Sequence, residues 1–100
     1  MNQKAVEIVH FRVKTGVPEA DFLQAAAKAD KALRSLPGFL SRQVSCAENG
    51  DWIDYVLWSS MADALEAARV FHTLPDAQDF CGMLDMSQAK MSHLSLVHES

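Results

Sequence analysis

The 100-residue sequence predicts a single α+β domain, residues 1–100, with the element order β-α-β-β-α-β. Four segments alternate apolar and polar residues as strands do, and two segments carry apolar residues at helical spacing. An Asn-Gly pair lies between the second and third predicted strands, as in a β-hairpin. Because each β-α-β half needs a right-handed crossover, we expect both helices on one face of a four-stranded antiparallel sheet.

The composition excludes several classes of function. Hydrophobic residues make up 49% of the chain and charged residues 22%, as is typical of a folded globule. A net charge of −4 and the lack of a basic stripe argue against a nucleic-acid partner, and no segment approaches the roughly 20 apolar residues of a membrane span. The N-terminus lacks the pattern of a signal peptide, and Cys46 and Cys81 lack CxxC spacing, so we expect reduced thiols and a cytoplasmic location.

The first half of the chain is predicted to form a strand, a helix and a second strand. Residues 5–14 alternate as a strand does, and Pro18 suits the first position of a helix over residues 18–36. The apolar stripe of this helix recurs at steps of four and three: Phe22, Ala26, Ala29, Leu33 and Leu36. Pro37-Gly38 ends the helix. Residues 39–47 alternate again, with one face formed by Leu40, Arg42, Val44 and Cys46.

Asn49-Gly50 predicts a two-residue type I′ turn, because both central residues of that turn need positive φ. The strand that follows, residues 52–58, carries large residues on both faces, so we expect it to be central in the sheet. Its two faces are Trp52, Asp54, Val56 and Trp58, and Ile53, Tyr55 and Leu57. Asp54 is the exception among them, since it places a carboxylate between two tryptophans.

The second half of the chain is predicted to contain an interrupted helix and a last strand. The segment Ser60 to Asp63 has the form of a capping box, so a helix is expected to begin at Met61. Leu74-Pro75 interrupts this helix, and Thr73 is expected to cap a second segment that continues to about residue 84. Residues 90–98 alternate as a strand.

One face of the predicted sheet has no cover within the monomer, because both helices lie on the other face. The strands nevertheless carry large apolar residues on both faces, and a bare apolar face marks an interface. We therefore expect a homodimer in which two sheets pack face to face through this open side.

Three stretches carry a resemblance to a known family: EIVHFRVKTGV, the segment Leu36-Pro37-Gly38-Phe39, and DWIDYVLWSSMADALEAA. Together with the element order, they resemble the dimeric α+β barrel superfamily, which has a ferredoxin-like fold. The closest groups are the antibiotic-biosynthesis-monooxygenase-like domains and the stress-responsive barrel domains. The resemblance covers nearly the whole chain. Its members include cofactor-independent monooxygenases, haem-degrading enzymes, isomerases and decyclases of small aromatic metabolites, and many proteins without known activity.

The catalytic residues of that family match this sequence only in part. The monooxygenase and haem-degrading members use an Asn together with a Trp, and Trp58 matches the Trp of the third strand. The only asparagines here are Asn2, near the terminus, and Asn49, in the turn. The haem-degrading members place an iron-binding His on the second helix, and His72 lies further from Trp58 than the family spacing.

Histidines and one carboxylate are the candidates for chemistry. The ferredoxin-like sheet order 4-1-3-2 brings His10, Asp54 or Trp58, and His93 onto adjacent strands. If they share a face, an Asp–His pair would form a general base, and His72 could point into the same cavity. We therefore expect a pocket between sheet and helices with His10, His72, His93 and Asp54 as catalytic residues. The expected walls for a flat apolar ligand are Trp58, Phe22, Phe71 and Arg12.

Each candidate also has a structural interpretation. A histidine on a half-apolar helix face often serves as a packing residue, and tryptophans often belong to a core or a dimer interface. Asp54 can pair with Arg42 or Arg12 across strands. No HxH or HExxH spacing and no nucleotide-binding motif is present, so we expect no metal and no cofactor.

The sequence thus predicts a monooxygenase-like barrel domain that binds a small aromatic or apolar molecule and can oxygenate it without a cofactor. A non-catalytic ligand-binding or stress-response dimer and a haem-binding protein are the alternatives.

Overall fold

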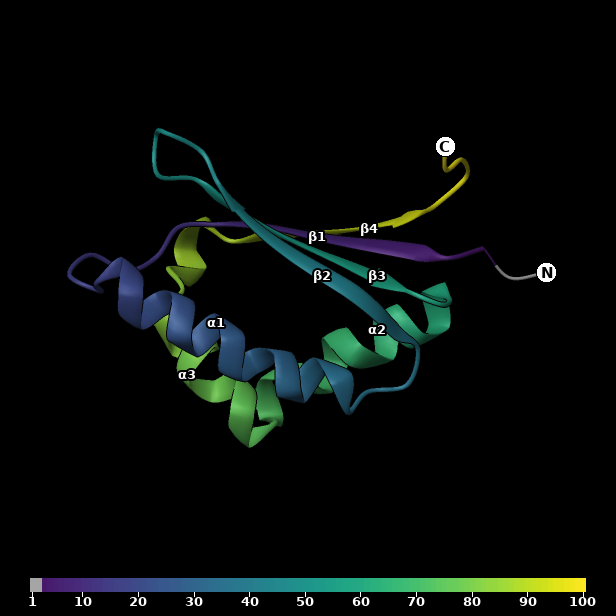
Figure 1. The fold of residues 1–100 in the computed structure, drawn as a ribbon, viewed down its shortest axis with the longest axis horizontal. Coiled ribbons are helices and arrows are strands. Elements are labelled where there is room, and N and C mark those ends of the chain that lie inside the picture. The colour runs from purple at the N-terminus through teal and green to yellow at the C-terminus, as the bar shows by residue number, and fades with distance from the viewer. Residues whose placement is uncertain (1–2) are drawn as a thin grey trace.

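A computed structural model describes residues 3–100 and confirms the predicted α+β, ferredoxin-like architecture (Figure 1). The elements in chain order are β1 (Ala5–Phe11), α1 (Glu19–Arg34), β2 (Phe39–Cys46), β3 (Trp52–Trp58), α2 (Met61–Val70), η1 (Phe71–Thr73), α3 (Pro75–Met83), η2 (Met86–Gln88) and β4 (Lys90–Ser95). The strands form one antiparallel sheet in the order β2-β3-β1-β4, as expected. Figure 1 shows the helices on one side of this sheet, with α1 beside α3. Within residues 3–100 no helix is both long enough and apolar enough to cross a membrane.

α2 begins at Met61, as the sequence predicts, whereas α1 runs from Glu19 to Arg34 and is shorter than the predicted helix over residues 18–36. Pro18 is not the first helical residue but the extended residue before it. Glu19 and Asp21 lie in the first turn of α1, where they favour the positive end of the helix dipole. The Ser60 hydroxyl accepts a hydrogen bond from the Asp63 backbone N–H at 3.1 Å, and the Ser59 hydroxyl donates to the Asp63 carboxylate at 2.8 Å. The first bond satisfies one backbone donor in the first turn of α2, as the predicted capping box requires. The Asp63 carboxylate accepts from the Ser59 hydroxyl instead of completing the box at the Ser60 N–H.

The predicted break at Leu74-Pro75 divides the second helix into α2 and α3, with η1 between them. The expected Thr73 cap is wrong, because the Thr73 hydroxyl donates back to the Val70 carbonyl at 2.6 Å. The residue before α3 is Leu74, which makes no side-chain cap, and Pro75 occupies the first helical position. A proline suits this position because it has no N–H to satisfy and its φ is already helical.

The hairpin between β2 and β3 uses a longer turn than the predicted type I′ turn. The Gly50 N–H donates to the Ala47 carbonyl at 3.1 Å, which closes a turn with Glu48 and Asn49 at its centre. Gly50 has φ of +90°, and among residues 3–100 only glycines have positive φ. Asn49 therefore does not take the conformation that a type I′ turn needs. The loop therefore matches the type I turn followed by a left-handed glycine that is common in longer hairpins.

The ends of several elements also differ from the prediction. β1 ends at Phe11, since beyond it Val13 makes only an isolated bridge to Leu84. β4 ends at Ser95, after which the Leu96 N–H donates to the Lys4 carbonyl. A bulge between Phe39 and Ser41 inserts Leu40 as an extra residue in β2. Leu40 is consequently 45% exposed, whereas strict alternation had placed it beside Arg42.

The helix-covered side of the sheet contains two clusters of buried side chains. The first includes Phe11, Phe22 and Phe80, and the second is built around Trp58 with Val56. Phe71 packs against both clusters. The space between sheet and helices where the clusters meet is not filled, and it forms the site described below.

Candidate functional site

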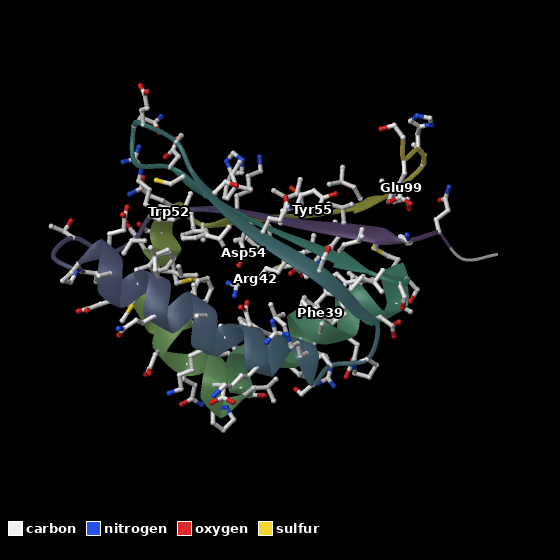
Figure 2. All side chains as sticks on the ribbon, viewed as in Figure 1. Phe39, Arg42, Trp52, Asp54, Tyr55 and Glu99 are labelled. Atoms are coloured by element: carbon white, nitrogen blue, oxygen red, sulfur yellow. The ribbon has the colours of Figure 1, made fainter. Side chains whose placement is uncertain are left out.

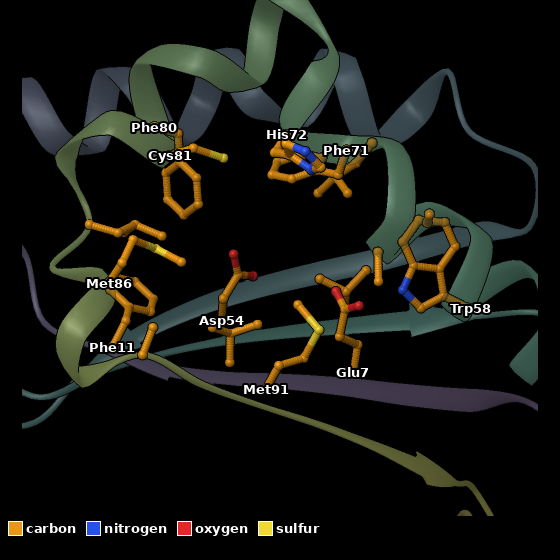
Figure 3. Close-up of a pocket in the computed structure, with 17 residues that line it drawn as sticks. Glu7, Phe11, Asp54, Trp58, Phe71, His72, Phe80, Cys81, Met86 and Met91 are labelled. Atoms are coloured by element: carbon orange, nitrogen blue, oxygen red, sulfur yellow. The ribbon is translucent and has the colours of Figure 1, made fainter.

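The site is a pocket of about 340 Å³ between the sheet and the helices (Figure 3). Its sheet side is formed mainly by Glu7, Val9, Asp54, Val56, Trp58 and Met91. Its helix side is formed mainly by Ala67, Ala68, Phe71, His72, Phe80 and Cys81. The lining is apolar apart from Glu7, Asp54, His72 and the Cys81 thiol. Its volume is at the small end of ligand pockets, which suits a molecule of two or three rings.

Asp54 is held by a buried arginine on the neighbouring strand β2. The guanidinium of Arg42 donates from Nη2 to Asp54 Oδ2 at 2.7 Å and from Nε to Asp54 Oδ1 at 3.0 Å. Nη1 of the same group donates to Asp30 on α1 at 2.9 Å and to the Ala26 carbonyl at 2.7 Å. Figure 2 shows Arg42 and Asp54 in the space between the sheet and α1.

The Arg42 side chain is only 4% exposed, and its guanidinium lies 4.8 Å from the centre of the Phe80 ring. Burial alone would lower the pKa of Arg42, but the hydrogen bonds and charges of Asp54 and Asp30 outweigh burial and raise the pKa. The arginine is therefore a fixed cation that joins β2, β3 and α1. This confirms the pairing of Asp54 with Arg42 that the sequence offered as one of two options.

Glu7 is the second buried carboxylate of the pocket, and its partner is a histidine. Glu7 Oε2 lies 2.8 Å from Nε2 of His93, which pairs with it across β1 and β4. Burial raises the pKa of the Glu7 carboxyl above its ordinary value of 4.5. The hydrogen bond and charge of His93 oppose this rise, and the negative charge of Asp54 adds to it.

Trp58 provides a hydrogen-bond donor that nothing in the described chain accepts. The residue is fully buried, yet its indole Nε1 has no partner among residues 3–100. In Figure 3 this nitrogen lies on the side of the ring that faces Glu7. A buried donor without a partner is costly, so an acceptor inside the pocket would stabilise it.

Exposed side chains lie around the pocket on its open side. His72 lies in η1, not on α2 as expected, and is exposed. Met86 and Met91 are 68% and 50% exposed, and both line the pocket. Burial raises the pKa of the Cys81 thiol, so Cys81 is a poor nucleophile.

Four of the eight predicted site residues line the pocket: Asp54, Trp58, Phe71 and His72. His93 lies on the same sheet face but bonds Glu7, so the expected Asp–His pair is a Glu–His pair. His10 lies on the opposite face of β1 and is exposed, so it does not share the face of His93.

Two predicted wall residues lie outside the pocket. Phe22 is fully buried in the first cluster, with its ring centroid 4.9 Å from that of Trp52. Arg12 pairs with Asp51 at 2.9 Å beside the hairpin, where both side chains are partly exposed.

Sequence reasoning missed Glu7 and the position of Arg42 next to the pocket. The signal for Glu7 was present, because Glu7 is the one charged residue in the alternating set that also contains Val9, Phe11 and Val13. A carboxylate on an otherwise apolar strand face is rare without a partner or a function.

Within residues 3–100, no group of three or more His, Cys, Asp or Glu side chains is placed to hold a metal ion.

Comparison with known proteins shows similarity in fold. No protein-family model matches the sequence, and no curated protein matches it. Among solved structures, a mutant of SnoaB, a cofactor-independent oxygenase from Streptomyces nogalater, is similar with a TM-score of 0.75 and 13% identity, over 97% of this chain and 96% of that chain. A protein from Bordetella bronchiseptica that is provisionally named as an antibiotic biosynthesis monooxygenase is similar with a TM-score of 0.72 and 18% identity, over 97% of this chain and 100% of that chain.

A dimeric ferredoxin-like protein of unknown function from Jannaschia sp. gives a TM-score of 0.68 and 18% identity, over 93% of this chain and 99% of that chain. These similarities confirm the predicted resemblance at the level of the fold. At such low identity the function must be argued from the site.

Proposed function

We propose that this protein binds a small hydroxylated aromatic molecule in the pocket and oxygenates it without flavin or metal. The observation that carries the proposal is the Trp58 Nε1, which has no partner within residues 3–100 and is buried at the wall of a mostly apolar cavity. An aromatic ligand with one oxygen acceptor would fill the cavity and satisfy this donor. The likeness in fold to a cofactor-independent oxygenase supports the same class of chemistry.

The reaction needs little from the protein because the substrate supplies the electrons. A hydroxyaromatic reacts with O₂ to give a quinone and water: one oxygen atom becomes the new carbonyl, and the other leaves as water with the hydrogens of the O–H and C–H bonds. The apolar lining would orient the ring and exclude bulk water, while Trp58 would stabilise the developing oxyanion. The pocket therefore has to position the substrate and accept a proton.

The test uses 1,8-dihydroxynaphthalene, whose oxygenation product is 5-hydroxy-1,4-naphthoquinone. Binding is measured by calorimetry under argon, and turnover by oxygen uptake and quinone absorbance in air. We expect Trp58→Phe to weaken binding roughly 2- to 10-fold, the value of one hydrogen bond. Trp52→Phe is the matched control, because Trp52 lies in the first cluster and does not line the pocket. Equal binding by wild type and Trp58→Phe would contradict the role of Trp58.

A non-catalytic ligand-binding dimer is the second candidate, and one observation favours it. The monooxygenases that the sequence resembles use an Asn together with the Trp. Here the Asn49 side chain donates to Asp51 at 3.1 Å in the hairpin, so Asn49 does not take that role beside Trp58. Asn2 lies outside the described residues. Binding of the naphthalene probe without oxygen uptake would support this candidate against the first.

We also infer that the open sheet face pairs with a second copy of the chain. This face carries the apolar side chains Val6, Ile8, Ile53, Tyr55, Leu57 and Leu94. Figure 2 shows Tyr55 on the opposite side of the sheet from Arg42 and Asp54. The dimeric ferredoxin-like protein among the similar structures supports this assembly. Sedimentation should give a dimer for wild type and a monomer for Tyr55→Glu, while Leu65→Glu, an exposed leucine on α2, should remain a dimer.

A further inference from the structure

We propose that Glu7 is the base that takes the hydroxyl proton of the substrate, and that His93 passes this proton toward solvent at the edge of the sheet. This inference rests on the proposed function, since it assigns the proton acceptor that such a reaction needs. Glu7 and His93 are 86 residues apart in the chain and meet only through the β1–β4 pairing.

The position of Glu7 is the first step. Glu7 lies in the middle of β1, a central strand with β3 on one side and β4 on the other. Its side chain is only 10% exposed and lines the pocket. An apolar residue here would extend the surrounding cluster, whereas a buried carboxylate costs folding free energy unless it is fully paired. Packing alone therefore gives no reason for a glutamate at this position.

The second step is that Glu7 is only half paired. Its Oε2 is hydrogen-bonded to Nε2 of His93. Within residues 3–100 its other carboxylate oxygen, Oε1, receives no side-chain hydrogen bond. That oxygen is free to accept a hydrogen bond from a ligand in the pocket. Burial raises the pKa of Glu7 above its ordinary value, so the difference between the pKa of Glu7 and that of an acidic phenol becomes smaller.

The third step is the juxtaposition of Glu7 and Trp58. Glu7 pairs with Val56, and Trp58 pairs with Ala5, so the two residues are diagonal neighbours on one sheet face, roughly 7–8 Å apart. One ligand hydroxyl between them can give its proton to Glu7 while its oxygen accepts from Trp58 Nε1. When the O–H bond breaks, the electron pair stays on the ligand oxygen and the proton joins the Glu7–His93 pair.

The fourth step is the route by which the proton leaves. His93 lies on β4, an edge strand, and its side chain is 17% exposed. The pair can thus return the extra proton to water from the imidazole without opening the pocket. The other charged or titratable groups at the pocket are Asp54 with Arg42 on the sheet, and His72 and Cys81 on the helix side. Arg42 already neutralises Asp54, so Glu7 is the carboxylate that remains available.

The test measures the ionisation of a bound chromogenic phenol, 4-nitro-1-naphthol, which changes absorbance when it loses its proton. At a pH just below the pKa of the free probe, we expect a larger naphtholate fraction on wild type than on Glu7→Gln. A carboxylate that does not receive the proton would have the opposite effect, because removing its negative charge would favour the bound naphtholate. Equal or greater ionisation on Glu7→Gln would therefore overturn the inference.

Turnover provides a second readout. With 1,8-dihydroxynaphthalene, Glu7→Gln should lower the rate at least about 100-fold while affinity changes little, as expected for loss of a general base. His93→Gln should lower the rate less and move the pH profile, because the carboxylate remains but its partner is lost. If Glu7→Gln does not fold, His93→Gln carries the test through the same profile. Binding with unchanged rates in a folded Glu7→Gln overturns the base alone, whereas failure of wild type to bind either naphthol overturns the proposed function as well.

Discussion

Asp54 and Glu7 are two buried carboxylates on neighbouring strands, and they face the same pocket. Asp54 receives three hydrogen-bond contacts from one guanidinium, which is itself bound by Asp30 and a backbone carbonyl. Glu7 has one imidazole nitrogen as its side-chain partner. Two acids on the same face of neighbouring strands therefore have different electrostatic surroundings.

The difference separates a structural ion pair from a group available for proton transfer. A permanent cation with matching geometry bonds both carboxylate oxygens of Asp54. Glu7 is partnered by a group that can itself gain or lose a proton, and burial favours its neutral form. Pairs of acids whose environments diverge in this way mark the division of roles in many active sites. The following substitutions test whether the contrast holds.

The largest effect is expected from Arg42→Met, which leaves Asp54 buried without its cation. Breaking a buried pair from one side typically lowers the free energy of unfolding by about 3–5 kcal/mol. Urea denaturation followed by circular dichroism measures the change. Lys28→Met is the matched control, since it breaks the exposed pair with Asp79 and should cost less than about 1 kcal/mol. A loss for Arg42→Met no larger than that of the control would contradict a structural role for the network.

A smaller effect is expected from the matched amides Asp54→Asn and Glu7→Gln. The Asn amide group cannot accept both guanidinium hydrogen bonds, so Asp54→Asn should cost about 1.5–3 kcal/mol. Gln at position 7 can still bond His93 and removes a buried charge, so Glu7→Gln should change stability by less than about 1 kcal/mol at neutral pH. Urea denaturation of both variants under the same conditions measures the two changes in the free energy of unfolding. Equal losses for the two variants would mean that the two acids do not differ as the structure indicates.

Alternation and helical spacing, together with the right-handed crossover rule, were sufficient to predict the architecture, and four of the eight predicted site residues line the pocket. They also placed Asp54 and Trp58 correctly, because residues 54 and 58 lie an even number apart on one strand and must share a face. The same rule separates His10 from Glu7, which are three residues apart. The partner of His93 could not be predicted, because it depends on the register between β1 and β4, and a shift of one residue exchanges the two faces.

The turn was mispredicted for a related reason. Asn49-Gly50 favours a two-residue loop when the flanking strands pair directly up to it. Here the last paired residues are Cys46 and Trp52, so the loop is longer and only Gly50 needs positive φ. Arg42 was visible as a possible partner of Asp54, but its burial under α1 depends on the packing of a helix that local patterns do not place.

The smallest and most specific effect is a pH dependence of stability that arises from Glu7. Because the pKa of Glu7 is raised in the folded state, its contribution to stability is fully present below 4.5, the ordinary value. As the pH rises above that value, the unfolded chain releases the proton while the folded chain retains it. Stability therefore falls until the pH has passed the folded pKa, and then stays level.

Glu7→Gln lacks this titration, so its stability relative to wild type should increase as the pH is raised from about 4 to 8 and then level off. Urea denaturation across this range measures the difference, and Glu48→Gln, in the exposed hairpin, is the control. In a His93→Gln background the increase should be larger, because the hydrogen bond and charge of His93 lower the pKa of Glu7. Parallel curves for wild type and Glu7→Gln would show that burial does not favour the protonated acid. Glu7 would then resemble Asp54, and the contrast between the two carboxylates would be lost.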